Sequence, residues 1–210
     1  MFEFKGSPVE VRDDLRNTYV EIWRHLAEPG PTLTGSQRVG LAEHVRAARS
    51  GDSSIRHDMP DALLHLASTL FRNPADVDGF MVRHAAEDAG NPMVVEIIGL
   101  VSMLAAVDGA HRGLTAELEP LPDPMDGEPT GVIAEGLKQR RTHVPMPAGP
   151  IPVALDLVPE VGQAYRDSFG PQYMTEAEMA FDDFNRIPGL NRAQIEIISS
   201  RISIHNECFY

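Results

Sequence analysis

Apolar residues recur at intervals of three and four along much of the chain, which is the spacing of helices that bury one face. No segment alternates apolar and polar residues over more than a few positions, so β-strands are not expected. The fold class is therefore predicted to be all-α. The pattern and its breaks at Gly and Pro predict helices over residues 11–26, 34–49, 61–71, 74–87, 93–117, 132–141, 154–169, 176–186 and 192–205.

The helix predicted over residues 93–117 is apolar nearly all round in its first half, which is typical of a buried central element. Its most apolar run, about fifteen residues from Met93 to Val107, contains Glu96 and is too short and too charged to be expected to span a bilayer. We interpret Glu96 as the partner of a hydrogen bond or ion pair between helices, with Arg112 as a candidate partner, rather than as a catalytic group.

Composition narrows the classes of function. A net charge of −13 argues against a nucleic-acid-binding or anionic-membrane surface. The one cysteine excludes an intrachain disulfide, and no zinc-ligand spacing includes it. His84, Glu87 and Asp88 lie together at the end of one predicted helix. No second carboxylate–histidine pair accompanies them, so we interpret them as a solvated face rather than a metal site. The N-terminus has no signal-peptide pattern, and we expect a soluble cytoplasmic protein without cofactor or metal.

The chain divides at a proline-rich segment. Eight of the 17 prolines lie in residues 118–152, around the short helix predicted over 132–141. This composition is typical of a linker between two units. The predicted division is a first unit over residues 1–120, a linker over 121–150 and a second unit over 151–210.

The last segment carries the most specific spacing. Eleven residues separate Glu196 from Cys208, and the sequence closes with Asn206-Glu207-Cys208-Phe209-Tyr210. This resembles the alkylhydroperoxidase D-like (carboxymuconolactone decarboxylase) superfamily, whose redox signature runs Glu, eleven residues, Cys, two residues, Cys, three residues, His. Glu196 and Cys208 match the first two positions. The second Cys would follow Tyr210 directly, and the His would lie four positions further on.

A weak internal repeat extends the resemblance. Residues 33–42 can be laid over residues 190–199 at an offset of 157, and residues 62–118 resemble the half of the superfamily unit that follows the redox motif. The resemblance implies one complete, degenerate helical bundle in the first unit and the front half of a redox unit in the second. The first unit has Val39 at the Glu position, Gly51 and Ser54 at the Cys positions and Asp58 at the His position, none of which can do thiol chemistry.

The resemblance implies a reaction and its partners. The expected function is reduction of a hydroperoxide substrate in antioxidant defence, with a dithiol reductant, protein or small molecule, and assembly as a homo-oligomer or tandem pseudo-dimer. A turn near Asn206 is expected to place Cys208 at the start of a returning helix, whose N-terminus stabilises a thiolate. Glu196 would then relay a proton through the His of that helix. The downstream Cys attacks the peroxide and Cys208 resolves it, with His205 as a further candidate for support.

Alternatives stay open. The sequence is expected to be cut short, either because a UGA codon for selenocysteine follows Tyr210 or because of a frameshift or fragment end, and the given chain is then expected to be inactive. A non-catalytic all-α interaction protein that keeps the fold is the second hypothesis, and a cofactor-free decarboxylase with a pocket at residues 50–57 is the third. In a monomer we expect low order beyond Gly189 and exposure of Ile195, Ile198 and Ile202.

Overall fold

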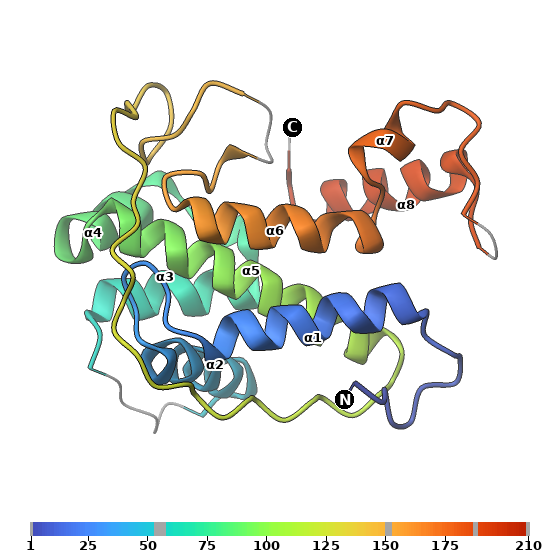
Figure 1. Cartoon of the computed structure of the whole chain (residues 1–210), viewed down its shortest axis with the longest axis horizontal. Helices are drawn as coiled ribbons and strands as arrows, with labels where there is room; N and C mark the ends of the chain where they lie inside the picture. Colours follow the sequence, from blue (N-terminus) through green and yellow to red (C-terminus); the bar gives the residue numbers. More distant parts are fainter. Residues whose placement is uncertain (1, 53–57, 150–152, 187–188, 209–210) are drawn as a thin grey trace.

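The computed structural model describes residues 2–52, 58–149, 153–186 and 189–208 (Figure 1). Within these ranges the regular structure is helical, with two isolated β-bridges and no strand, so the all-α prediction is confirmed. The helices are α1 (Asp13–Ala27), α2 (Gly35–Ser50), α3 (Asp61–Arg72), the 3₁₀ turn η1 (Pro74–Asp76), α4 (Gly79–Ala89), α5 (Asn91–Gly113), α6 (Pro159–Gln172), α7 (Glu176–Met179) and α8 (Arg192–His205).

Helix α5 is the central helix of the bundle, as predicted, and α1, α2, α3, α4 and α6 all pack against it (Figure 1). Val94, Ile97 and Val101 are among its fully buried side chains. With 23 residues it is long and apolar enough to cross a membrane, so the expectation that it is too short is wrong. Because 61% of its most apolar window is buried inside the bundle, this length is weak evidence for a membrane span.

Several predicted helix ends agree with the structure, because the capping residues are readable in the sequence. Thr34, the first residue of the predicted helix, caps α2 by accepting a hydrogen bond from the backbone N–H of Gln37. Helix α5 ends at Gly113, four residues before the predicted end at Glu117. Thr115 takes the left-handed conformation there, with φ 54°, and the Ala116 N–H donates to the carbonyl of His111.

Two predicted helices are shorter in the structure. The helix expected over residues 74–87 is divided into η1 and α4, because the Asp78 side chain accepts from the N–H groups of Phe80 and Met81 and starts a new helix. The segment predicted over 176–186 is helical only as α7, which ends at Met179. The Arg192 guanidinium donates to the carbonyl of Phe181 and holds the chain that follows α7.

Two further predictions concern the chain before α6. The helix predicted over 132–141 is wrong: Gly131 and Gly136 have φ of 66° and 73°, and Lys138 forms an isolated bridge with Met146. The helix predicted over 154–169 starts instead at Pro159, a residue suited to a first helical turn, and continues to Gln172.

The proline-rich segment lies along the bundle and is bonded to it. The Trp23 indole donates to the carbonyl of Pro120, the Met125 N–H donates to Ala27, and the Thr130 N–H donates to Gly30. Beyond this segment, α6 packs on α1 and α5. Gly99 of α5 lies against Val161 of α6 so closely that a Cβ at this glycine would be 2.2 Å from the valine side chain. Thus α6, assigned to the second predicted unit, shares a hydrophobic core with the first.

Candidate functional site

Helix α8, which carries Glu196, begins as α2 does. Asn191 caps α8 and Thr34 caps α2. In both cases the residue three positions later is a glutamine, whose side-chain oxygen accepts a hydrogen bond from the backbone N–H of the cap. The two caps lie 157 residues apart, as the predicted repeat requires. The bounds of α8, Arg192–His205, are those predicted from the sequence.

The chain reverses immediately before Cys208. The Cys208 N–H donates to the carbonyl of Ser203, and the Glu207 N–H donates to Ile204. This bond pair is a Schellman motif, in which the residue after the helix takes the left-handed conformation. That residue is Glu207, with φ 51°, which directly follows Asn206, near which the turn was expected.

The equivalent turn of α2 has the same bonds. The Gly51 N–H donates to the carbonyl of Ala48, and the Asp52 N–H donates to Ala47. By its hydrogen bond Asp52 corresponds to Cys208, whereas the predicted repeat pairs Gly51 with Cys208. Of the other equivalent positions, Val39 is buried and Asp58 is exposed, while Ser54 lies outside the described residues, as does most of the 50–57 stretch considered for a decarboxylase.

Glu196 is held near the start of α8. One carboxylate oxygen accepts a 2.7 Å hydrogen bond from the Tyr173 hydroxyl, and the other lies 3.3 Å from the Arg192 guanidinium. Burial raises the pKa of Tyr173, and the hydrogen bond and charge of Glu196 act in the same direction. No sequence pattern indicated Tyr173, because its contact depends on how the chain returns between α6 and α8.

The predicted site residues are not in mutual contact. His205 lies nine positions after Glu196 on α8, a rise of about 14 Å. Cys208 is exposed with a free thiol beyond the helix, and His205 is exposed in its last turn. Glu196 and Cys208 could therefore cooperate only through a further group lying between them.

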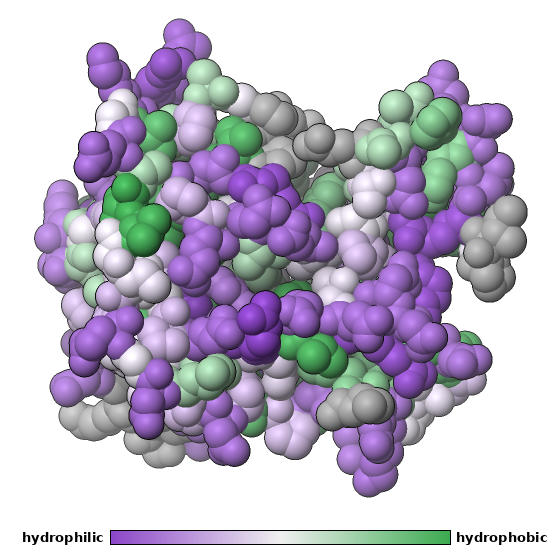
Figure 2. Space-filling model, in the orientation of Figure 1, coloured by the Kyte–Doolittle hydropathy of each residue, from purple (hydrophilic) through white to green (hydrophobic). Residues whose placement is uncertain are grey.

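A groove runs beside α8. Its volume is about 900 Å³, and it lies between α5, α6 and α8. On the side of α8 it is lined by Ile195, Ile198 and Ile202. Ile195 is buried, whereas Ile198 and Ile202 are 46% and 55% exposed, so the predicted exposure is correct for two of the three. Figure 2 shows the lobe that carries α7 standing out from the rest of the surface.

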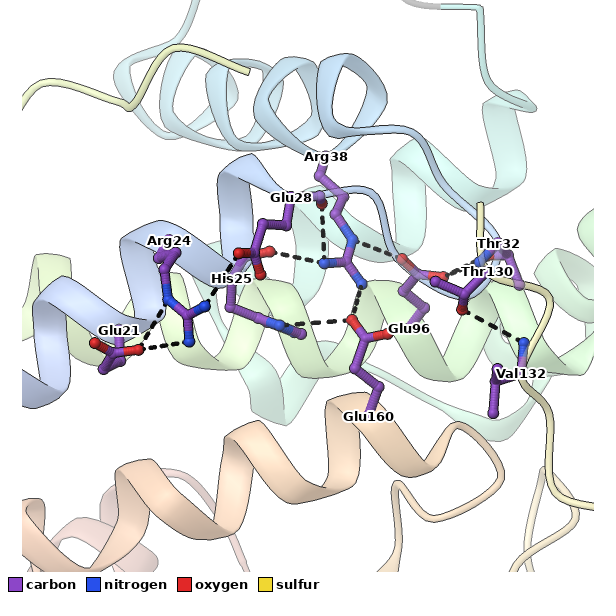
Figure 3. A network of polar contacts seen from close by, with 10 residues as sticks. All are labelled: Glu21, Arg24, His25, Glu28, Thr32, Arg38, Glu96, Thr130, Val132 and Glu160. Carbon is purple, nitrogen blue, oxygen red and sulfur yellow. Dashed lines mark hydrogen bonds and ion pairs between the residues drawn. The ribbon is translucent and has the colours of Figure 1, made fainter. Parts of the chain in front are cut away.

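The first unit contains a buried ion pair (Figure 3). Glu96 and Arg38 are both fully buried, and the Arg38 Nε donates to Glu96 Oε1 over 2.7 Å. The other Glu96 oxygen accepts from the backbone N–H and the hydroxyl of Thr32, at 2.7 and 2.6 Å. The interpretation of Glu96 as an ion-pair residue is confirmed, but the expectation that Arg112 is its partner is wrong. Arg112 lies on the same helix, about 24 Å further along, and pairs with Asp108 instead.

The signal for Arg38 was present in the sequence. It occupies the buried stripe of α2 that continues with Leu41, Ala42 and Val45, so a charge at this position requires a buried partner. Glu96, the acidic residue in the apolar first half of α5, is the matching anomaly.

Two titratable groups border this ion pair. Burial lowers the pKa of His25 to about 3, and the charges of Arg38 and Arg24 act in the same direction. His25 is therefore neutral near pH 7, and its 3.7 Å approach to Glu160 is not an ion pair. Burial raises the pKa of Glu160 and outweighs the Arg38 guanidinium, which lies 3.3 Å away.

Among the described residues, no group of three or more His, Cys, Asp and Glu side chains lies close enough together to hold a metal ion. Comparison with family models, with curated proteins and with solved structures finds no match to the chain. The resemblance to the alkylhydroperoxidase D-like superfamily therefore depends on the residues of the sequence alone.

Proposed function

We propose that the chain carries part of a thiol-dependent hydroperoxide reductase site of the alkylhydroperoxidase D-like type. The observation that carries the proposal is the end of α8: a Schellman motif reverses the chain directly before the exposed thiol of Cys208. Glu196 lies on the same helix, held by Tyr173, at the spacing that the superfamily uses. A segment that returned along α8 from Cys208 would place a group between the thiol and the carboxylate.

The proposed reaction is a two-electron reduction. A thiolate or selenolate, at the position that follows Tyr210, attacks the hydroperoxide; its bond to oxygen forms, the O–O bond breaks and an alcohol leaves. Cys208 then attacks the oxidised sulfur or selenium and displaces water, which closes a disulfide or selenenyl sulfide. A cytoplasmic dithiol reductant supplies two electrons and two protons and restores both groups. Glu196 relays the proton through the histidine of the returning segment.

The nucleotides after the Tyr210 codon give the first test. The proposal expects a Cys codon or UGA next, followed in frame by a His codon four positions later. A reading frame without that histidine refutes it.

Peroxide consumption gives the second test, with a dithiol as reductant. The 210-residue chain is expected to turn over no faster than its Cys208→Ser variant. The chain extended through the returning histidine is expected to turn over, and Cys208→Ser should then abolish turnover. Glu196→Gln should slow it by about 10²–10⁴-fold, as the loss of a general acid–base group does. Glu207→Gln, which removes a carboxylate beside the thiol but outside the relay, is the matched control.

A second candidate function is a non-catalytic interaction protein. The observation that favours it is the set of exposed isoleucines on α8, at positions 197, 198, 202 and 204. Exposed apolar patches of this kind are typical of protein contact surfaces. This function predicts that Cys208→Ser changes peroxide consumption in neither form of the chain, and that Ile202→Asp weakens binding of the partner.

A further inference from the structure

The groove between α5, α6 and α8, here called the α8 groove, has the size of a small-molecule site. Its volume of about 900 Å³ lies at the upper end of the range for such sites. On the side of α8 its lining runs from Ile195 to Asn206, about 16 Å along the helix axis. The groove therefore fits an elongated occupant.

The walls of the α8 groove are mainly apolar. Met103 of α5, Phe169 of α6 and Ile198 of α8 line it from three sides. Helix α5 also contributes Ala105 and Gly109, small residues that leave the space between the helices open. An apolar chain is the matching occupant of such walls, because it removes their surface and its own from water.

The charged lining of the α8 groove is basic. Among the described residues it consists of Arg12 and Arg186, although the whole sequence has 31 acidic and 18 basic residues. Both guanidinium groups face Asp14, at 2.9 and 3.7 Å, so they lie together. The Arg186 N–H donates to the carbonyl of Leu190, two residues before α8, which places the pair at the end of the groove where α8 begins.

Both guanidinium groups can be reached from the groove. The Arg12 side chain is 37% exposed and that of Arg186 is 16% exposed. The bonds of Arg12 to Asp14 and to the Pro171 carbonyl use its Nε and Nη2 atoms, so Nη1 takes part in neither. Asp14 and Glu178, the carboxylates that face the two arginines, do not line the groove. An occupant of the groove therefore meets the positive groups rather than their counter-ions.

We propose that the α8 groove binds an amphiphilic anion, a carboxylate at one end of an unbranched apolar chain. The carboxylate lies beside Arg12 and Arg186, whose planar guanidinium groups suit it. The chain extends along α8 past Ile198 and Ile202 toward Asn206. An organic cation with the same chain is a poorer match, because it would place its charge beside two guanidinium groups.

The proposed binding is independent of the thiol chemistry proposed above. Ile197 and Ile204, the most exposed isoleucines of α8, are not part of the groove lining. A segment that returned along α8 and the anion would therefore use different faces of the helix.

An NMR titration of the full chain tests the proposal. The probes are decanoate and decylammonium, which share their chain and differ in charge, each kept below the concentration at which it forms micelles. Because the net charge of the protein is −13, general electrostatics favours the cation. Decanoate is nonetheless expected to give saturable shifts of the α5, α6 and α8 amides along the groove, and to bind there about tenfold more tightly than decylammonium.

A substitution on α5 tests the place of binding. Gly109→Leu puts a side chain into the α8 groove, and a Cβ at Gly109 meets no atom within 4 Å, so the fold should be kept. Filling the groove should weaken decanoate binding about tenfold. Gly113→Leu is the matched control: its Cβ also meets no atom within 4 Å, it lies on the same helix, and it does not line the groove. It should leave binding unchanged.

A second pair of variants tests the charge. Arg12→Gln should weaken decanoate binding about fivefold, the effect of one partly screened charge pair. Arg83→Gln changes the net charge equally on the exposed face of α4 and should leave binding unchanged. Equal weakening within either matched pair, decylammonium binding in the groove as tightly as decanoate, or the absence of saturable shifts there would overturn the proposal.

Discussion

Replacing Glu96 by Gln should destabilise the protein severely. Glu96 is fully buried and accepts three hydrogen bonds, one from Arg38 and two from Thr32, all between 2.6 and 2.7 Å. Glutamine keeps the size of the side chain but removes the negative charge, so the buried Arg38 guanidinium loses its fully buried counter-ion and keeps only the partly exposed Glu160 carboxylate at 3.3 Å. The glutamine side chain also places an NH₂ group, which can only donate, where the donors of Arg38 and Thr32 need an acceptor. Removal of one partner of a buried pair costs about 3–5 kcal/mol.

The double substitution separates the charge from the packing. Arg38→Met alone should cost a similar amount, because it leaves the Glu96 carboxylate buried and unpaired. Arg38→Met combined with Glu96→Leu removes both charges, so it should cost much less than the sum of the single changes. A residual loss of about 1–3 kcal/mol should remain, because Thr32 still loses the acceptor of its backbone N–H.

Urea unfolding provides the measurement. Trp23, the one tryptophan of the sequence, is buried in α1 within the bundle and reports its unfolding by fluorescence. Arg24→Met, which breaks ion pairs at the surface, is the control and should leave the midpoint unchanged. A loss below about 1 kcal/mol in Glu96→Gln, or additive single changes, would refute the account of this pair.

Three further predictions concern pH and the helix ends. Unfolded His25 takes up a proton below its ordinary pKa of 6.5, whereas the folded form does so only at about 3, so stability falls as pH falls between these values. The loss from this group should be about 2 kcal/mol at pH 5, and His25→Gln should remove this part of the pH dependence of urea unfolding. Glu207→Gly should stabilise the end of α8 by about 1 kcal/mol in hydrogen exchange, whereas Asn206→Gly should not, because only Glu207 has a positive φ. Asn191→Ala and Thr34→Ala should each cost about 1 kcal/mol in the thermal unfolding of their helices, and an unchanged transition in either would contradict its capping role.

The features that could be predicted from the sequence are those fixed by nearby residues. Helix α8 starts where predicted because Asn191 and Gln194 form a local capping box, and it also ends at the predicted residue, His205. The buried character of α5 follows from its own composition. Local signals also account for the error at residues 74–87, since Asp78 is a good helix cap and its position inside the predicted helix was a readable warning.

The features that could not be predicted depend on distant parts of the chain. Glu96 was recognised as a buried partner, but Arg38 lies 58 residues earlier, and only the packing of α2 against α5 brings them together. Phe2 and Phe4 are buried against Tyr19 and His111, although nothing near the N-terminus indicates what covers them. Tyr173 and Glu196 meet for the same kind of reason.

The comparison of α2 with α8 shows what the candidate site lacks. Both helices start with a capping box and end with a Schellman motif. Helix α2 buries Arg38, Val39, Leu41, Ala42 and Val45, whereas the one buried side chain among the described residues of α8 is Ile195. Because their local structures match, the difference lies in what packs against them: α1, α3 and α5 cover α2, and a wide groove borders α8. Under the function proposed above, a site around Glu196 and Cys208 would therefore need a segment or molecule that packs on α8 as these helices pack on α2.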